Sequence, residues 1–317
     1  MMHNHCPSSI TVLTPFLPIR CRCGADPGPQ QPPLGCLVAF RRGLRDLGYV
    51  EGQNITVAYR YAEGQRDRLS TLAAELVRLT PDVLWTNSTP AALAAKQATT
   101  TIPIVVGSGG DLVELGLVAS LARPGGNLTG VDSRPLDLLG KQLELFKETV
   151  LTISHVVVLV DPAARAHDRV PSTIEVEARV LGVQLQRVEA GAPDAFEAAF
   201  ATMVQGGADA LMIMDTAFFV QHRQRLQELA LRHRLPTMSG TRFHAEAGGL
   251  LAYGAFSLEL CQRSAVLVDK ILKGAKPADL PVERGDKFYL VVNLKTAAAL
   301  GLTISPLFLG RADEVLR

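Results

Sequence analysis

Short apolar runs alternate with amphipathic helical patterns along most of this chain, and the alternation limits the folds open to it. The pattern is clearest over residues 82–130, which read as strand, polar loop, helix, strand, polar loop, helix, turn and strand. Strands that alternate with helices form parallel sheets covered by helices on both faces. We therefore expect an α/β protein whose polar loops follow the strand ends.

The same periodicities place the remaining elements. Strands are predicted at residues 54–61, 82–85, 102–106, 128–131, 155–160, 183–188, 208–214, 236–239, 250–253 and 287–293. Helices are predicted from about 34 to 47, then at 67–79, 91–98, after 111, and at 136–149, 173–181, 194–205, 218–234, 257–273 and 294–300, with one more short helix within 303–317. Four of these strands precede Leu136 and four lie between His155 and Ser239, which indicates two sheets.

Composition excludes several classes of function. Lys and Arg (32) balance Asp and Glu (31), so net charge gives no reason to expect a nucleic-acid partner. No apolar run reaches the roughly 18 residues that span a bilayer. The histidines lack metal-ligand spacing, and the five cysteines indicate neither a disulfide framework nor a zinc site, with Cys261 far from the other four. No catalytic motif is present, so we expect no enzyme activity, metal or cofactor.

Residues 1–34 differ from everything that follows. They hold seven prolines and show no helical or strand period. We expect a disordered segment without a recognisable signal peptide.

The first polar loop, Thr86-Asn87-Ser88-Thr89, precedes a proline suited to the first position of a helix. Thr89 is then predicted to be the N-cap. The free N–H groups at such a helix start, with hydroxyls beside them, suit a carboxylate. The alternative is that Ser88 and Thr89 only cap the helix.

The second polar loop has the sequence Gly107-Ser108-Gly109-Gly110-Asp111. Its glycines allow a close approach of the backbone to a ligand. Glu114 lies three residues beyond Asp111, a spacing typical of a capping box. Asp111 is therefore either the N-cap of a helix or a carboxylate that faces the ligand.

Two aspartates follow buried strands in the second half of the chain. Asp161 and Asp215 end consecutive apolar runs, so both are expected at the carboxyl edge of the second sheet. Asp161-Pro162 is also a favourable turn pair. Recognition of an ammonium group is the functional interpretation, and turn formation the structural one.

Several blocks resemble one group of bacterial ABC-transporter substrate-binding proteins. They are residues 40–54 (FRRGLRDLGYVEGQN), 61–64 (YAEG), 89–98 (TPAALAAKQA), 116–127 (GLVASLARPGGN) and 293–297 (NLKTA). The resemblance implies a type I periplasmic-binding fold, with two doubly wound lobes joined by three crossings. We expect the first lobe at residues 35–133 plus about 251–283, and the second at 134–250 plus about 284–317.

By the same resemblance, the protein binds a small molecule between its lobes and passes it to a membrane permease driven by ATPase subunits. Amino acids, aromatic or branched, are the ligands it suggests. The implied ligand-binding residues are Thr86, Asn87, Ser88, Thr89, Ser108, Asp111, Asp161, Asp215, Phe218 and Tyr253. Hydroxyls and helix N–H groups would hold the carboxylate of the ligand, an aspartate its amine, and aromatic rings its side chain.

Such proteins are periplasmic or lipid-anchored, and they begin with an export signal and an apolar first strand. Here residues 1–34 occupy that place, so we expect a wrong start or a shifted reading frame, and a first sheet without one central strand. Two other functions stay open. One is the ligand-sensing domain of a regulator, and the other is an α/β enzyme that acts on a small polar metabolite.

Overall fold

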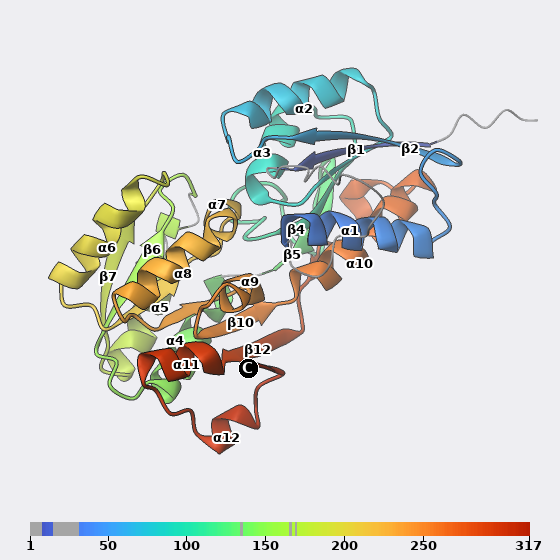
Figure 1. The fold of residues 1–317 in the computed structure, drawn as a ribbon. Helices are drawn as coiled ribbons and strands as arrows, with labels where there is room; N and C mark the ends of the chain where they lie inside the picture. Colours follow the sequence, from blue (N-terminus) through green and yellow to red (C-terminus); the bar gives the residue numbers. More distant parts are fainter. Residues whose placement is uncertain (1–7, 15–31, 134–135, 165–166, 169) are drawn as a thin grey trace, which may run out of the picture. The chain divides into compact units, whose positions relative to one another are not determined.

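The computed structural model describes residues 8–14, 32–133, 136–164, 167–168 and 170–317, which form two compact units (Figure 1). The described residues up to Ser133, together with Ser257–Gly285, make the first unit. The described residues of 134–256 and 286–317 make the second. The chain therefore passes from one unit to the other three times. No helix in the described part of the chain is long and apolar enough to cross a bilayer.

The first unit is built on a parallel sheet that contains six strands in the described residues, in the order β11-β5-β4-β3-β1-β2. Its elements are β1 (Ser8–Thr14), α1 (Pro32–Asp46), β2 (Ile55–Tyr61), α2 (Arg68–Arg78), β3 (Val83–Thr86), α3 (Thr89–Ala98), β4 (Ile104–Gly109), β5 (Leu128–Asp132), α10 (Ser257–Leu272), η3 (Pro277–Asp279) and β11 (Glu283–Arg284).

Strand β1 corrects the expectation for the amino-terminal segment. Ser8–Thr14 lies between β2 and β3 and pairs with both, so the first sheet has the central strand that the sequence suggested was missing. Ile10 and Val12 alternate into the core, where they are almost fully buried. The strand pattern of residues 8–14 is short and lies among prolines, so the sequence did not predict it. Pairing with β2 and β3 stabilises the strand. The rest of the predicted disordered segment, residues 1–7 and 15–31, lies outside the described residues.

Both faces of the first sheet are buried, as parallel sheets require. Leu84 packs on the side of α2 and α3, whereas its neighbour Trp85 packs on the side of α1 and α10. The Trp85 ring stacks on Phe40 with 4.2 Å between centroids, and its Nε1–H donates to Ser264 Oγ at 2.8 Å. The single tryptophan of the chain is therefore a core residue.

A disulfide bond joins Cys36 of α1 to Cys261 of α10, with 5.4 Å between the Cα atoms and 225 residues between them in sequence. The prediction that Cys261 stands apart from the other cysteines was wrong. Cysteine spacing could not reveal this pair, because packing of α1 against α10 brings the two residues together. Cys6, Cys21 and Cys23 lie outside the described residues.

The second unit is built on a sheet that contains seven strands in the described residues, in the order β13-β12-β10-β9-β8-β6-β7, parallel except for the pair β10–β12. Its elements are η1 (Leu136–Leu138), α4 (Leu139–Thr149), β6 (His155–Val160), α5 (Val170–Val180), β7 (Gln184–Glu189), α6 (Ala195–Gln205), β8 (Ala210–Ile213), α7 (Ala217–Gln221), α8 (Arg223–Arg232), β9 (Thr237–Ser239), α9 (Arg242–Glu246), β10 (Leu251–Ala255), β12 (Phe288–Asn293), α11 (Leu294–Leu300), α12 (Pro306–Leu309) and β13 (Glu314–Leu316).

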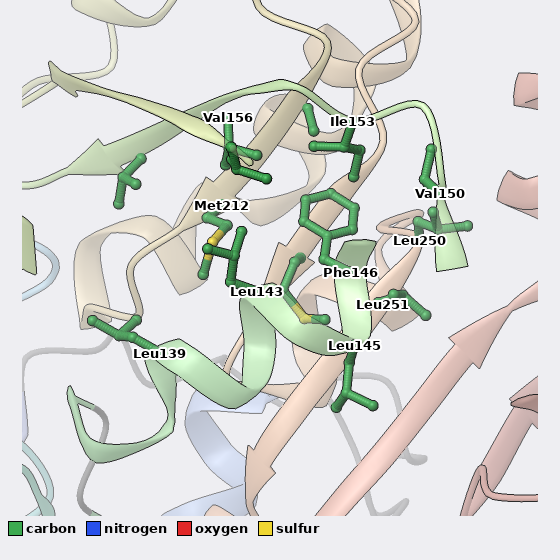
Figure 2. Packing of buried hydrophobic residues seen from close by; sticks show 14 of the residues in the cluster. Leu139, Leu143, Leu145, Phe146, Val150, Ile153, Val156, Met212, Leu250 and Leu251 are labelled. Carbon is green, nitrogen blue, oxygen red and sulfur yellow. The ribbon is translucent and has the colours of Figure 1, made fainter. Parts of the chain in front are cut away.

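This sheet is also buried on both faces. Val156 points to the cluster formed with α4 and α5, and Val157 points to the opposite cluster with α6 and α8. Figure 2 shows the first cluster, in which Leu143 of α4 lies beside Met212 of β8, and Phe146 of α4 beside Ile153. The apolar run of β6 is thus explained by burial on two sides.

Three boundaries differ from the sequence predictions. Strand β10 pairs with β9 and β12, so the expected return to the first sheet near residue 251 occurs only at Ser257. The helix expected over residues 218–234 is divided at His222 into α7 and α8. The last segment forms α12 and then β13, which extends the second sheet.

Candidate ligand-binding site

Most of the predicted site residues lie at or just beyond the carboxyl ends of strands, in one sheet or the other. In the first unit, Thr86 ends β3 and is fully buried, and Asn87 and Ser88 follow with 8% exposure each. Ser88 is the N-cap of α3, because its Oγ accepts the N–H of Ala91 at 3.3 Å. The predicted cap, Thr89, is already the first helical residue.

Thr89 instead ties α3 to the next strand end. Its hydroxyl accepts the N–H of Gly110 at 3.1 Å and lies 3.4 Å from the carbonyl oxygen of the same residue. The start of α3 also offers fewer donors than the sequence suggested. Pro90 has no N–H, and Ala91 and Ala92 donate to the side chain and carbonyl of Ser88. In this first turn, the backbone N–H of Thr89 is therefore the one donor that could bind an anion.

Two buried oxygens at this edge have no hydrogen-bond partner among the described residues. They are Thr86 Oγ1 and Asn87 Oδ1. A buried polar atom without a partner costs about 1–3 kcal/mol, so these atoms are candidates for contact with a polar ligand. Ser108, half-buried in β4, lies on the neighbouring strand.

Asp111 does not begin a helix. Its φ of 57° is left-handed, and residues 112–119 form turns and bends rather than the predicted helix. Asp132 at the end of β5 holds the start of this turn, because its carboxylate accepts the N–H groups of Asp111 at 3.3 Å and Leu112 at 3.2 Å. Asp132 was not among the predicted site residues, although it ends an apolar run as Asp161 and Asp215 do.

The glycines of the second polar loop have a packing role. A Cβ atom on Gly107 would lie 2.4 Å from Cζ2 of Trp85. A side chain on Gly109 would approach Val106 to 2.8 Å. Close packing in the core therefore accounts for glycine at both positions. That a ligand approaches the backbone here stays a prediction.

In the second unit, Asp161 and Asp215 follow β6 and β8, which are neighbours in the sheet. Asp161 is fully buried, and its Oδ1 accepts the N–H of Ala163 at 3.0 Å. Its own N–H donates to His167 Nδ1 at 3.1 Å. The prediction that Asp161 forms a turn is confirmed, and a contact with ligand stays a prediction.

Asp215 is in a different environment. Its side chain is 22% exposed, its carboxylate accepts the backbone N–H of Gly240, and its Oδ1 is buried without a hydrogen-bond partner in the described part of the chain. Burial raises the pKa of Asp215 to about 7. A Cβ on residue 240 would lie 2.2 Å from Asp215 Oδ2, so a larger residue there would displace this carboxylate.

Two aromatic residues complete the predicted set. Phe218 in α7 is half-buried, with its ring centroid 5.6 Å from that of Phe196 and 5.0 Å from that of His222. Tyr253 is half-buried on β10, and its ring lies 6.1 Å from Phe288. The Tyr253 carbonyl accepts the amide of Gln142 at 2.8 Å, a contact across elements that the sequence could not show.

No group of three or more metal-ligating side chains occurs within the described residues. The two edges supply hydroxyls, amides, carboxylates and aromatic rings, the groups that line binding sites for small polar molecules.

Two sheet-and-helix units with polar strand-end loops are the architecture of type I periplasmic binding proteins. The chain belongs to the ABC transporter substrate binding protein family, whose model matches residues 37–316. The resemblance found in the sequence is therefore confirmed.

Individual relatives agree with this assignment. A tyrosine-binding protein of Clostridioides difficile is 28% identical over 275 residues, which are 83% of this chain and 75% of the relative. A conserved domain protein from Vibrio cholerae has a TM-score of 0.85 at 25% identity and matches 97% of this chain and 99% of its own. An ABC domain from Streptococcus pneumoniae, solved in complex with L-Trp, has a TM-score of 0.87 at 23% identity over 98% and 100% of the two chains.

Proposed function

We propose that this protein is the extracytoplasmic solute-binding component of an ABC importer, and that its ligand is a free amino acid with an aromatic or branched side chain. The family assignment supports the role, and delivery to a permease with its ATPase subunits follows from that role. The tyrosine-binding relative and the L-Trp complex support the ligand class.

The observation that carries the ligand class is the carboxylate of Asp215. It lies at a parallel-sheet edge, where ligands of such folds bind, and it is partly exposed in an otherwise buried setting. A carboxylate held this way favours a cationic partner, because a nearby positive charge offsets the cost of its ionisation. We assign it to the α-amino group of the ligand.

The remaining predicted residues take complementary roles in this proposal. The Thr86 hydroxyl can donate to the ligand carboxylate, and Asn87 Oδ1 can accept from an N–H or O–H group of the ligand. Phe218 and Tyr253 have aromatic surface suited to its side chain. Asp161 shapes the turn after β6. That one solute is taken up between the lobes stays a prediction of the sequence.

Calorimetric titration tests the proposal. Purified protein is titrated with L-tyrosine, L-tryptophan, L-phenylalanine and L-leucine, and with 3-(4-hydroxyphenyl)propionate, which lacks only the amine of tyrosine. We expect at least one amino acid to bind. We also expect Asp215→Asn to weaken that binding at least about tenfold, or 1.4 kcal/mol. Asp194→Asn is the matched control, because Asp194 is exposed and makes no side-chain cap bond.

Two results would contradict the proposal. One is that none of the four amino acids binds. The other is that Asp215→Asn and Asp194→Asn leave the affinity equally unchanged. Chromatography of the ligand after long incubation completes the test, since a binding protein returns it chemically intact.

A further inference from the structure

Three buried polar side chains of the second unit form a hydrogen-bonded row, and the residue at one end of the row lies next to Asp215. Gln227 of α8, Thr237 of β9 and His244 of α9 are exposed by 2%, 3% and 0%. They come from three elements and meet in the interior of the second unit. Burying such polar groups costs folding free energy unless each one has a hydrogen-bond partner.

The hydrogen bonds in this row have a defined direction. The Thr237 hydroxyl accepts the N–H of Leu250 at 3.2 Å and donates to Gln227 Oε1 at 2.9 Å. The amide nitrogen of Gln227 therefore faces His244, with 3.2 Å between Nε2 and the ring Nδ1. Because an amide NH₂ can only donate, Nδ1 must accept, and the proton of a neutral His244 ring is placed on Nε2.

That Nε2–H faces Asp215. His244 Nε2 lies 3.9 Å from Asp215 Oδ1, and neither atom has a hydrogen-bond partner among the described residues. A shift of roughly 1 Å brings the two atoms within hydrogen-bond distance. The opposite tautomer would turn a lone pair of Nε2 toward a carboxylate oxygen, which is unfavourable.

We propose that His244 is a positioning residue for ligand recognition: its Nε2–H holds Oδ1 of Asp215, so that Oδ2 is the oxygen offered to the ligand amine. This inference rests on the proposed function of Asp215. The burial of Oδ1 agrees with it, since the exposed part of the side chain then lies on its other atoms, of which only Oδ2 accepts hydrogen bonds.

Burial, and next a positive charge nearby, keep the ring neutral. Burial, and next the charge of Arg223 on α8, lower the pKa of His244 to about 3. Arg223 in turn interacts with Glu246 of α9 and donates to the carbonyl of Val220 at 2.9 Å. Among the described residues, Arg223 therefore acts on the ring, Glu246 acts on Arg223, and Asp215 faces the ring at 3.9 Å. A neutral ring donates one hydrogen bond to Asp215 and does not cancel its charge, which stays available to an ammonium group.

Two substitutions separate this role from simple packing. His244→Asn keeps a group near Nδ1 and removes the donor at Nε2, whereas His244→Gln can restore an N–H near the Nε2 position. We expect His244→Asn to reduce the affinity ratio of L-tyrosine to 3-(4-hydroxyphenyl)propionate at least about fivefold, and His244→Gln to restore part of it. A purely structural role would weaken both ligands alike and leave the ratio unchanged, and that result would overturn the inference.

Nuclear magnetic resonance of ¹⁵N-histidine-labelled protein tests the inference without any ligand. We expect the His244 signals, assigned by their loss in His244→Asn, to show the neutral Nε2–H form at pH 7.5. We also expect His244→Asn to raise the pKa of Asp215, followed through its side-chain ¹³C signal. The Nδ1–H form, or an unchanged Asp215 pKa, would overturn the inference. If wild-type protein binds no amino acid but both signals behave as expected, the proposed ligand fails while the His244–Asp215 interaction stands.

Discussion

At the scale of single residues, one acid and one base of the second unit, Asp215 and His244, have strongly shifted pKa values. Burial raises the pKa of Asp215 to about 7 and lowers that of His244 to about 3. Between about pH 4 and 6.5 the folded pair therefore holds one proton on the acid, and the unfolded pair holds one on the base. Because both states bind the same number of protons, the pair makes stability nearly independent of pH in this window.

Removing either partner exposes the contribution of the other. In Asp215→Asn only His244 titrates, and its folded pKa lies below the unfolded value, so stability is expected to rise with pH from 4 to 6.5. In His244→Asn the raised pKa of Asp215 makes stability fall as pH rises from 4 to 7. Each slope reaches at most about 1.4 kcal/mol per pH unit. Urea unfolding at pH 4.5, 5.5 and 6.5 measures them, and parallel curves for both variants would contradict the assignment.

Ligand affinity has its own pH dependence. A protonated Asp215 cannot pair with an ammonium group, and its pKa of about 7 places the change near neutrality. We expect the affinity for an amino acid to rise up to about tenfold per unit from pH 5 to 7 and then to level off. Calorimetry at four pH values follows it, with Asp215→Asn as the variant that should show no such rise. A flat wild-type profile would mean that Asp215 does not bind the amine.

At the scale of elements, local sequence rules succeeded where burial was strong and failed where a distant residue decided the outcome. The apolar runs of β6 and β8 were found because both of their faces are buried. The helix after Asp111 was predicted from a capping-box spacing. In the structure the backbone N–H groups of Asp111 and Leu112 donate instead to Asp132 at the end of β5, and no helix forms. The same limit applies to Ser88 and Thr89, since the Thr89 hydroxyl is engaged by Gly110.

Helix capping gives a prediction with an internal control. Ser88 caps α3 through its Oγ, whereas Asp194 occupies the N-cap of α6 without a side-chain bond. We expect Ser88→Ala to lower the free energy of unfolding by about 1 kcal/mol and Asp194→Ala to have a much smaller effect. Chemical denaturation of both variants compares them, and equal losses would show that the Ser88 bond does not stabilise the helix.

At the scale of the whole molecule, composition and alternation were enough to predict two α/β units, and the family blocks identified the class. The sequence did not reveal how the chain divides between the units at its late crossings. Strand β10 looks like any other apolar run, and only its pairing with β9 and β12 assigns it to the second sheet. Likewise, the pairing of β1 with two strands overrides the disorder that its proline-rich surroundings indicate.

The disulfide allows a prediction at the same scale. It closes a loop of 225 residues, and in the chain-entropy model a loop of that size restricts the unfolded state by about 5 kcal/mol. We expect the Cys36→Ala/Cys261→Ala double variant to unfold at lower denaturant than oxidised wild type. Reduced wild type should resemble the variant. Identical midpoints for oxidised and reduced wild type would indicate that the bond does not form in solution.

The same bond changes what a protease can accomplish. It joins α1 to α10, two helices of the first unit that precede and follow residues 134–256 in the chain. Every peptide bond of residues 134–256 therefore lies inside a covalently closed ring. A single cut there leaves one particle of unchanged mass on a non-reducing gel, and reductant must be added before two pieces separate. Formation of such a ring is favoured in an oxidising compartment, which suits a protein that works outside the cytoplasm.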